Sequence, residues 1–234
     1  MNLLWEYKSE RYQESDLGYF ILHDNLIELY SVDHTGTCSS HVIGRQIEVP
    51  QHYKEVIFEE KVWFMPLEFV DVKLVGLEAN TRSLVDEGIY IAYESENGDA
   101  VHLIQPIYQK AVRMTMKHKN LVYVWYHGKT LILLIFKEGQ LHLGNVFDVD
   151  GHVDAVYYIT AAMQDAKFDV QSHYLVCDAD EKDAQVLGND FEKLGIHMDI
   201  FYNEKPYQKS SEFPNMVFAS SLMYIFSCAL PEAY

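Results

Sequence analysis

The stretch from Leu121 to Phe168 reads LVYVWYHGKTLILLIFKEGQLHLGNVFDVDGHVDAVYYITAAMQDAKF. It holds three runs rich in β-branched and aromatic residues, and only the short connections GK and KEG separate them. Connections of this length are typical of antiparallel hairpins. After Asp148 the apolar residues recur with helical spacing instead of alternating, which predicts a helix from His152 to Phe168. The stretch therefore predicts a three-stranded meander that leads into a helix.

Strands and helices alternate after this meander. HYLVCD, from His173 to Asp178, is apolar enough for a buried strand, and IHMDIF, from residue 196 to 201, is a second one. Between them the amphipathic stretch 181–195 predicts a helix, with Asp180 as its N-cap and Gly195 just after its last turn. From residue 121 onward the expected order is strand, strand, strand, helix, strand, helix, strand.

The first half of the chain predicts a weaker version of the same order. It opens with a hairpin in which Asp24 and Asn25 suit the tight turn between two strands. The expected strands are residues 18–23, 26–32, 37–49, 62–66 and 88–95. The expected helices are residues 51–60, a short one beginning at Pro66, and one after Pro106. At the other end of the chain, residues 213–230 predict a final apolar core helix.

The element order of the second half resembles the ribonuclease H-like half of an actin-like domain. Residues at six positions also match a pattern of uncharacterised proteins from Bacteroidetes: Leu141, Asn145, Phe147, Asp154, Tyr157 and Tyr158. VWFMPLEFVD, from Val62 to Asp71, resembles a segment of the same family. That family is similar to the actin-like superfamily, which includes the pilus-assembly protein PilM. The resemblance implies an α/β fold with mixed sheets and two ribonuclease H-like halves, residues 1–118 and 119–234.

An actin-like fold implies a nucleotide site between two β-hairpins, each commonly carrying Asp-x-Gly for phosphate and Mg²⁺. The first hairpin here has Asp24 and Asn25 without an adjacent glycine, and the second has Tyr126 where the aspartate would stand. The sequence HGKT also lacks the spacing of a P-loop. The candidate cleft residues are Asp24, Asn25, His127, Gly128, Lys129 and Asp178; the last lies at the carboxyl end of a predicted strand, where α/β folds often bind ligands. We expect His127-Gly128-Lys129 to form a hairpin turn in which Gly128 has a positive φ.

The acidic stretch DVDGHVD, residues 148–154, suggests either a metal loop or a helix start. An EF-hand beginning at Asp148 would need an oxygen ligand at position 5, glycine at position 6 and glutamate at position 12. Those positions hold His152, Val153 and Ile159. A helix start explains the stretch better, with Asp150 as the N-cap and Asp154 near the positive end of the helix dipole. We therefore expect no metal here.

Charge and cysteine content narrow the class of protein. The chain of 234 residues carries 35 acidic and 18 basic residues, a formal charge of −17. That balance disfavours nucleic acid, whose phosphates require clustered Lys and Arg. No apolar run approaches the ~18 residues of a membrane helix, and the charged N-terminal stretch does not resemble a signal peptide. The three cysteines, Cys38, Cys177 and Cys228, form no CxxC motif and fit free thiols of a cytoplasmic protein, with the last two in the core.

These patterns favour an uncharacterised, non-catalytic actin-like scaffold, a pseudo-ATPase with eroded phosphate loops that binds a protein partner. No cofactor is required under this hypothesis. The alternative is an actin-like ATPase that binds ATP and Mg²⁺ in an altered pocket. A third hypothesis, a metal-dependent nuclease, is disfavoured because the strand GYFILH, residues 18–23, offers no carboxylate for a two-metal site.

Overall fold

The computed structural model describes nine segments of the chain: residues 17–23, 26–32, 38–44, 54–58, 62–66, 81–86, 89–94, 100–168 and 173–200. Residue contacts divide the chain into two compact units. The first unit comprises Met1–Phe58, Asn97–Pro106 and Glu204–Tyr234, and the second comprises Glu59–Glu96 and Ile107–Asn203. The expected division into two ribonuclease H-like halves, residues 1–118 and 119–234, stays a prediction.

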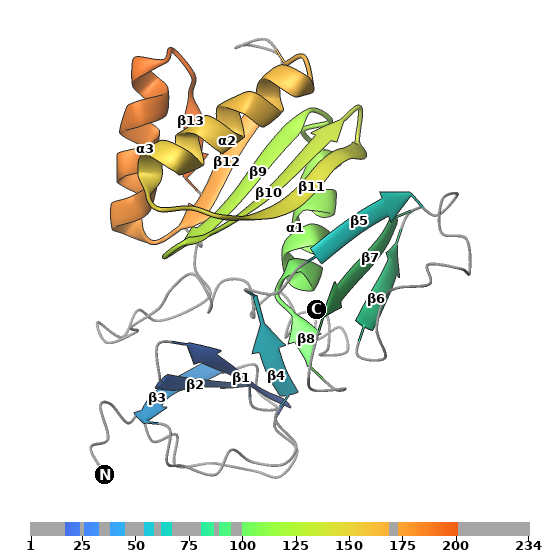
Figure 1. Cartoon of the computed structure of the whole chain (residues 1–234), viewed down its shortest axis with the longest axis vertical. Coiled ribbons are helices and arrows are strands. Elements are labelled where there is room, and N and C mark those ends of the chain that lie inside the picture. Colours follow the sequence, from blue (N-terminus) through green and yellow to red (C-terminus); the bar gives the residue numbers. More distant parts are fainter. Residues whose placement is uncertain are drawn as a thin grey trace. The chain divides into compact units, whose positions relative to one another are not determined.

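The described part of the first unit is a five-stranded mixed sheet with the order β3-β2-β1-β4-β8. Its strands are β1 (Leu17–His23), β2 (Leu26–Val32), β3 (Cys38–Gly44), β4 (Lys54–Ile57) and β8 (Val101–His102). The first three are antiparallel neighbours, and β4 runs parallel to both β1 and β8 (Figure 1). The predicted first hairpin and third strand are confirmed. Asp24 and Asn25 lie outside the described residues.

The helix predicted for residues 51–60 is wrong, because β4 occupies the middle of that stretch. Its backbone pairs with β1 on one side and β8 on the other. Val56 and Phe58 are buried, whereas Glu55 and Ile57 are only partly so, which is the period of a strand. Pairing within the sheet has overridden the helical spacing of the local sequence.

The second unit contains the fold that the meander predicts. Its larger sheet has the order β11-β10-β9-β12-β13. The strands are β9 (Leu121–His127), β10 (Thr130–Lys137), β11 (Gln140–Asp148), β12 (Tyr174–Ala179) and β13 (Met198–Ile200). The helices are α1 (Ile104–Thr115), α2 (His152–Asp165) and α3 (Glu181–Lys193), with the boundary between the units falling inside α1, after Pro106. From β9 to β13 the order is the predicted one, although α2, α3 and β13 are shorter than expected. The helix expected after Pro106 begins earlier, at Ile104.

Two-residue turns join the three strands of the meander. His127 pairs with Thr130, and Gly128 between them has a φ of 58°, as expected from the sequence. In the second turn both Glu138 and Gly139 have positive φ, 55° and 86°. Positive φ at the centre of a two-residue turn matches the right-handed twist of the strands that it joins. The turns therefore fix the register of the meander.

Helices cover both faces of this sheet, so β9 and β10 are buried on both sides (Figure 1). On one face Val124 and Leu133 belong to the core cluster that includes residues of α2 and α3. On the opposite face Tyr108 of α1 lies 6.1 Å from Phe136 of β10, measured between ring centroids. This arrangement explains why LILLIF is apolar throughout instead of alternating.

The ends of α3 follow the sequence prediction. Asp180 accepts a hydrogen bond from the Asp183 N–H at 2.9 Å, which confirms it as the N-cap. At the other end Gly195 has a φ of 73°, and the Ile196 N–H donates to the Phe191 carbonyl at 2.9 Å. This is the hydrogen-bond pattern of a Schellman motif, which needs glycine for the left-handed residue.

The predicted N-cap of α2 is wrong. Gly151 is the N-cap, and its carbonyl accepts the first helical hydrogen bond, from the Ala155 N–H at 3.1 Å. Asp150 lies one residue too early, and it is the Asp154 carboxylate that accepts from the Asp150 N–H, at 3.1 Å. The acidic stretch still begins the helix, as expected, but through Asp154 in its first turn.

A three-stranded antiparallel sheet, β5-β7-β6, also belongs to the second unit. Its strands are β5 (Val62–Pro66), β6 (Thr81–Asp86) and β7 (Ile89–Glu94). The strands β5 and β7 are as predicted, whereas the sequence did not indicate β6. The residues predicted to form a helix after Pro66, and those of the C-terminal helix 213–230, lie outside the described residues. None of the described helices is long and apolar enough to cross a membrane.

Candidate functional site

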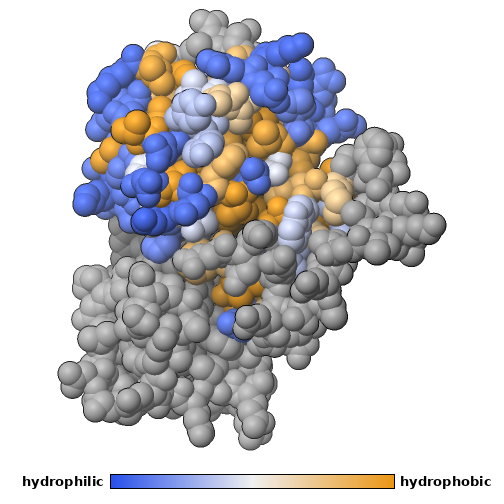
Figure 2. Space-filling model, viewed as in Figure 1, coloured by the Kyte–Doolittle hydropathy of each residue, from blue (hydrophilic) through white to orange (hydrophobic). Residues whose placement is uncertain are grey.

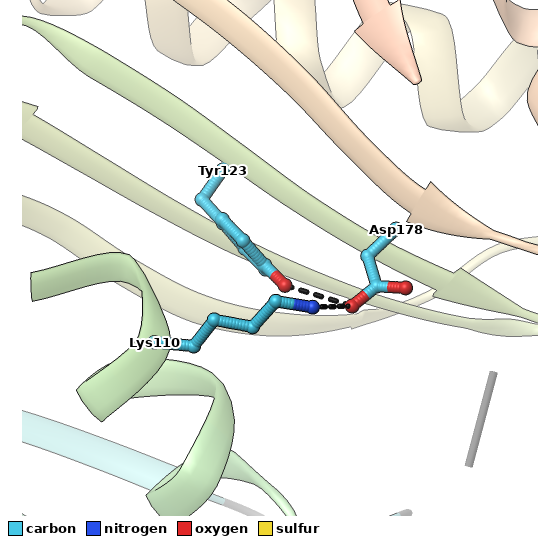
Figure 3. A network of polar contacts seen from close by, with 3 residues as sticks. All are labelled: Lys110, Tyr123 and Asp178. Carbon is cyan, nitrogen blue, oxygen red and sulfur yellow. Dashed lines mark hydrogen bonds and ion pairs between the residues drawn. The ribbon is translucent and has the colours of Figure 1, made fainter. Parts of the chain in front are cut away.

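A buried polar network joins α1 to the larger sheet of the second unit (Figure 3). The Lys110 ammonium of α1 donates to Asp178 Oδ2 of β12 at 2.7 Å. The Tyr123 hydroxyl of β9 donates to the same oxygen at 2.8 Å. The side chains of Lys110 and Asp178 are 9% and 2% exposed. One carboxylate oxygen thus receives a cationic donor and a neutral donor away from bulk water.

Strand register brings Tyr123 and Asp178 together. The parallel pair β9 and β12 aligns Tyr123 with Val176 and Trp125 with Asp178. Residues two apart on a strand share a face, so Tyr123 and Asp178 both point to the side covered by α1. Lys110 comes to this face because it follows the buried Ile107 by one helical turn.

Burial controls the protonation of Tyr123. Desolvation, followed by the negative charge of Asp178 and the hydrogen bond to it, raises the Tyr123 pKa well above its usual value near 10. The phenol therefore remains a donor at neutral pH. The ring also lies under the Lys110 ammonium, 5.8 Å from Nζ to the ring centroid.

The structure gives Asp178 and Lys129 different partners. Lys129 Nζ lies 3.4 Å from Asp150 Oδ1, and the two side chains are 73% and 89% exposed. Asp178 is held inside by Lys110. The residues His127, Gly128 and Lys129 are together at the β9–β10 turn, while Asp24 and Asn25, the other cleft candidates, lie outside the described residues.

A second polar contact joins the beginnings of α2 and α3. His152 Nε2 is hydrogen bonded to Asp183 Oδ1 at 2.9 Å, and both side chains are partly buried. The Tyr126 ring packs edge-on to the His152 ring with centroids 5.6 Å apart. Burial, then the charges of Asp183 and Asp180, raises the Tyr126 pKa. The residue at the position expected for a hairpin aspartate is thus a buried phenol that packs beneath the two helices.

The sequence also predicts free cysteines, two of them in the core, and no metal at the acidic stretch. Cys177 is a free thiol in the core, as predicted, and burial raises its pKa. Cys38 lies in β3, and Cys228 lies outside the described residues. Among the described residues, no group of three or more His, Cys, Asp or Glu side chains could hold a metal ion.

Lys110, Tyr123, His152 and Asp183 were not identified as site residues from the sequence. One signal was present: Lys110 stands on the apolar face of an amphipathic helix, and Asp178 ends the apolar run of a buried strand. Both of these faces are buried in the fold, and a buried charge needs a partner of opposite sign. Lys110 and Asp178 could therefore have been expected to pair.

Comparison with known proteins identifies the fold. Residues 82–193 match a protein family described as a protein of unknown function (DUF3822). A Bacteroides thetaiotaomicron protein with an actin-like ATPase fold and unknown function superposes with a TM-score of 0.66 at 11% identity, covering 90% of this chain and 96% of that one. The PilM-PilN type IV pilus biogenesis complex superposes at 0.52 with 9% identity, covering 94% of this chain and 100% of that one. No protein of curated function matches.

These similarities confirm the actin-like fold expected from the sequence, together with its mixed α/β sheets. They also confirm the resemblance to an uncharacterised family with this fold.

Proposed function

We propose that this chain is a non-catalytic actin-like module that binds a protein partner. The observation that carries the proposal is the pairing of Asp178 with Lys110 and Tyr123. A carboxylate at the end of a central strand could otherwise organise Mg²⁺ and water beside a nucleotide. Here it is buried and already neutralised by an ammonium group 2.7 Å away.

The hairpin between β9 and β10 supports the same proposal. Tyr126 replaces the expected aspartate, and it is buried against His152 instead of facing solvent at the turn. The exposed Lys129 ammonium lies beside Asp150. A phosphate would have to compete with this carboxylate for the lysine, and the negative charge of Asp150 would repel it.

A protein partner is supported by one of the similar folds, which was solved as a complex of PilM with PilN. The identity is too low to transfer that partner. It supports only the general use of this fold as a module for protein assembly.

A thermal-shift titration tests the proposal. The protein is heated with millimolar ATP, ADP or GTP, with and without Mg²⁺. We expect an unchanged melting temperature. A ligand at ~100 times its dissociation constant would stabilise the native state by about 2.7 kcal/mol, which is easily measured.

The alternative, an actin-like ATPase with an altered pocket, rests on the exposed Gly128-Lys129 turn. It predicts a magnesium-dependent shift that disappears in Lys129→Ala. The matched control is Lys182→Ala, which removes an exposed lysine from α3. A shift that Lys129→Ala abolishes and Lys182→Ala preserves would overturn the non-catalytic proposal.

A further inference from the structure

Four lysines gather at one end of the larger sheet of the second unit. Lys117 and Lys119 lie between α1 and β9. Lys137 is the last residue of β10, and Lys167 follows α2. All four are exposed. Because β9 and β10 are antiparallel, the start of β9 and the end of β10 lie at the same end of the sheet. Figure 2 shows hydrophilic side chains gathered over this end, at the upper right of the second unit.

Hydrogen bonds hold together the segments that carry these lysines. The Gly139 N–H donates to the Lys119 carbonyl at 2.8 Å, which ties the β10–β11 turn to the residues before β9. The Lys137 ammonium donates to the Ala166 carbonyl at 3.3 Å, and Lys167 is the next residue. The four ammonium groups therefore belong to one surface, although they come from three separate segments.

This end differs in charge from the whole chain. Its acids among the described residues are Glu138 and Asp165, and Asp165 Oδ2 lies 3.6 Å from His142 Nε2. None of the four lysines forms an ion pair with another residue in the described part of the chain. Lysines thus outnumber acids here, whereas the whole chain has 35 acidic and 18 basic residues.

The opposite end of the same sheet is acidic. The stretch 148–154 holds Asp148, Asp150 and Asp154, and it begins where Asp148 pairs with the first residue of β10. The only lysine of the adjoining β9–β10 turn, Lys129, lies beside Asp150. The second unit therefore carries opposite charges at its two ends, and an acidic molecule would be steered to the basic one.

An apolar side chain lies among the lysines. Met116, next to Lys117, is 79% exposed. Two residues further on, the His118 ring stacks on Tyr174 of β12 with centroids 3.9 Å apart, which holds this loop against the sheet. The flexible thioether of methionine adapts to many apolar partners. We name this surface the basic end, and it comprises Met116, Lys117, Lys119, Lys137 and Lys167.

We propose that the basic end binds an acidic segment of another protein. Glutamate or aspartate side chains of the segment pair with the lysines, and an apolar side chain of the segment covers Met116. This inference rests on the proposed function, since it gives the surface and the chemistry of the protein partner.

The charge of the chain favours a narrow acidic segment over an anionic membrane or a second copy. A membrane surface is wide, and the formal charge of −17 would oppose its approach. Two copies would repel each other for the same reason. A short segment interacts mainly with the lysines that it touches, because charges more than about 10 Å away are screened by salt.

Fluorescence anisotropy with a labelled peptide tests the inference. The probe alternates pairs of glutamates with single leucines, and the control peptide has glutamine in place of glutamate. We expect the full chain to bind the acidic probe, more weakly as the salt concentration rises, and not to bind the control peptide.

Two double variants locate the binding. Lys117→Gln/Lys119→Gln should bind the acidic probe about fivefold more weakly, or less still. The matched control, Lys129→Gln/Lys182→Gln, removes two exposed lysines from the opposite end of the sheet and should bind the probe as the unchanged protein does. Both double variants change the net charge equally, so a difference between them is due to position.

Met116→Ser separates the apolar contact from the charges. It should weaken binding about threefold and leave the salt dependence unchanged, whereas Lys117→Gln/Lys119→Gln should reduce the salt dependence. Because the three replaced side chains are exposed, the melting temperatures of these variants should equal that of the unchanged protein. Carbodiimide, which joins carboxylates to neighbouring amines, should attach the probe to lysines of the basic end.

Three results would overturn the inference: no binding of the acidic probe, equal binding by Lys117→Gln/Lys119→Gln, or cross-links mainly to other lysines. Tighter binding to phosphatidylserine vesicles than to the probe would also overturn it, in favour of a membrane. Self-association that the same double variant abolishes in sedimentation velocity would do so in favour of a second copy. The failures are distinguishable, because only a magnesium-dependent nucleotide shift overturns the proposed function itself.

Discussion

Lys110 and Asp178 are 68 residues apart in the sequence, and their charged groups lie 2.7 Å apart within the second unit. The pair fixes α1 against the strand that continues the meander. Because Tyr123 donates to the same oxygen, three elements depend on one carboxylate. The stability of this arrangement can be measured directly.

Replacing Lys110 with Met should lower the free energy of unfolding by about 3–5 kcal/mol, because Asp178 would lose its cationic partner while staying buried. Urea denaturation measures this loss. Lys110→Met/Asp178→Leu removes both charges and should be less destabilised than the sum of the single variants. Additive losses would show that the two side chains do not act as a pair.

The raised pKa of Tyr123 makes the stability depend on alkaline pH. Below pH 10 the phenol is protonated in both the folded and the unfolded chain. Above pH 10 only the unfolded chain releases this proton, so the free energy of unfolding should fall by up to about 1.4 kcal/mol per pH unit from this residue.

Tyr123→Phe provides the comparison. It should be destabilised by about 1–3 kcal/mol at neutral pH, because Asp178 loses a donor. Its disadvantage should shrink as the pH rises above 10, because phenylalanine has no proton to release. Denaturation curves recorded from pH 7 to 11 test this, and a constant difference between the two proteins would argue against a protonated Tyr123.

The glycines of β11 and α3 should respond in opposite ways to alanine. A Cβ at Gly144 would lie 2.7 Å from ring atoms of Phe64, so Gly144→Ala should be destabilised by about 1–3 kcal/mol. At Gly188 the nearest atom, Met198 Cε, is 3.6 Å away, so Gly188→Ala should be stabilised by about 0.5–1 kcal/mol. Thermal melts of the two variants make the comparison, and a stabilised Gly144→Ala would mean that the Phe64 ring does not lie against Gly144.

Alanine substitutions test which of the two predicted N-cap residues, Asp180 for α3 and Asp150 for α2, caps its helix. Asp180→Ala should cost about 1 kcal/mol, because the Asp183 N–H loses its acceptor. Asp150→Ala should leave the unfolding midpoint nearly unchanged, because that carboxylate is exposed and caps no helix. A large loss of stability in Asp150→Ala would show that Asp150 caps α2, as the sequence predicted.

The meander was predictable because its information is local. Gly128 and Gly139 mark the turns, and the apolar runs between them can only be strands. Gly195 marks the end of α3 for the same reason. In each case a few neighbouring residues decide the backbone conformation.

The features that the sequence did not reveal depend on distant partners. Residues 51–60 have helical spacing, yet β4 is a strand because β1 and β8 lie on either side of it. The polar stretch TRSLVD becomes β6 because β7 supplies its hydrogen bonds. Lys110 stands on the apolar face of its helix, but the sequence does not show that the fold brings it to Asp178, 68 residues away.

The position of the meander between Lys110 and Asp178 has a kinetic consequence. Hairpins with two-residue turns form within about 1–10 μs, because their contacts are local. The ion pair can close only after α1 and β12 have both docked on the finished meander. We therefore expect it to be absent from the folding transition state, so that its loss speeds unfolding and leaves the refolding rate unchanged. The pair then determines how long the native state lasts, and not how quickly it is reached.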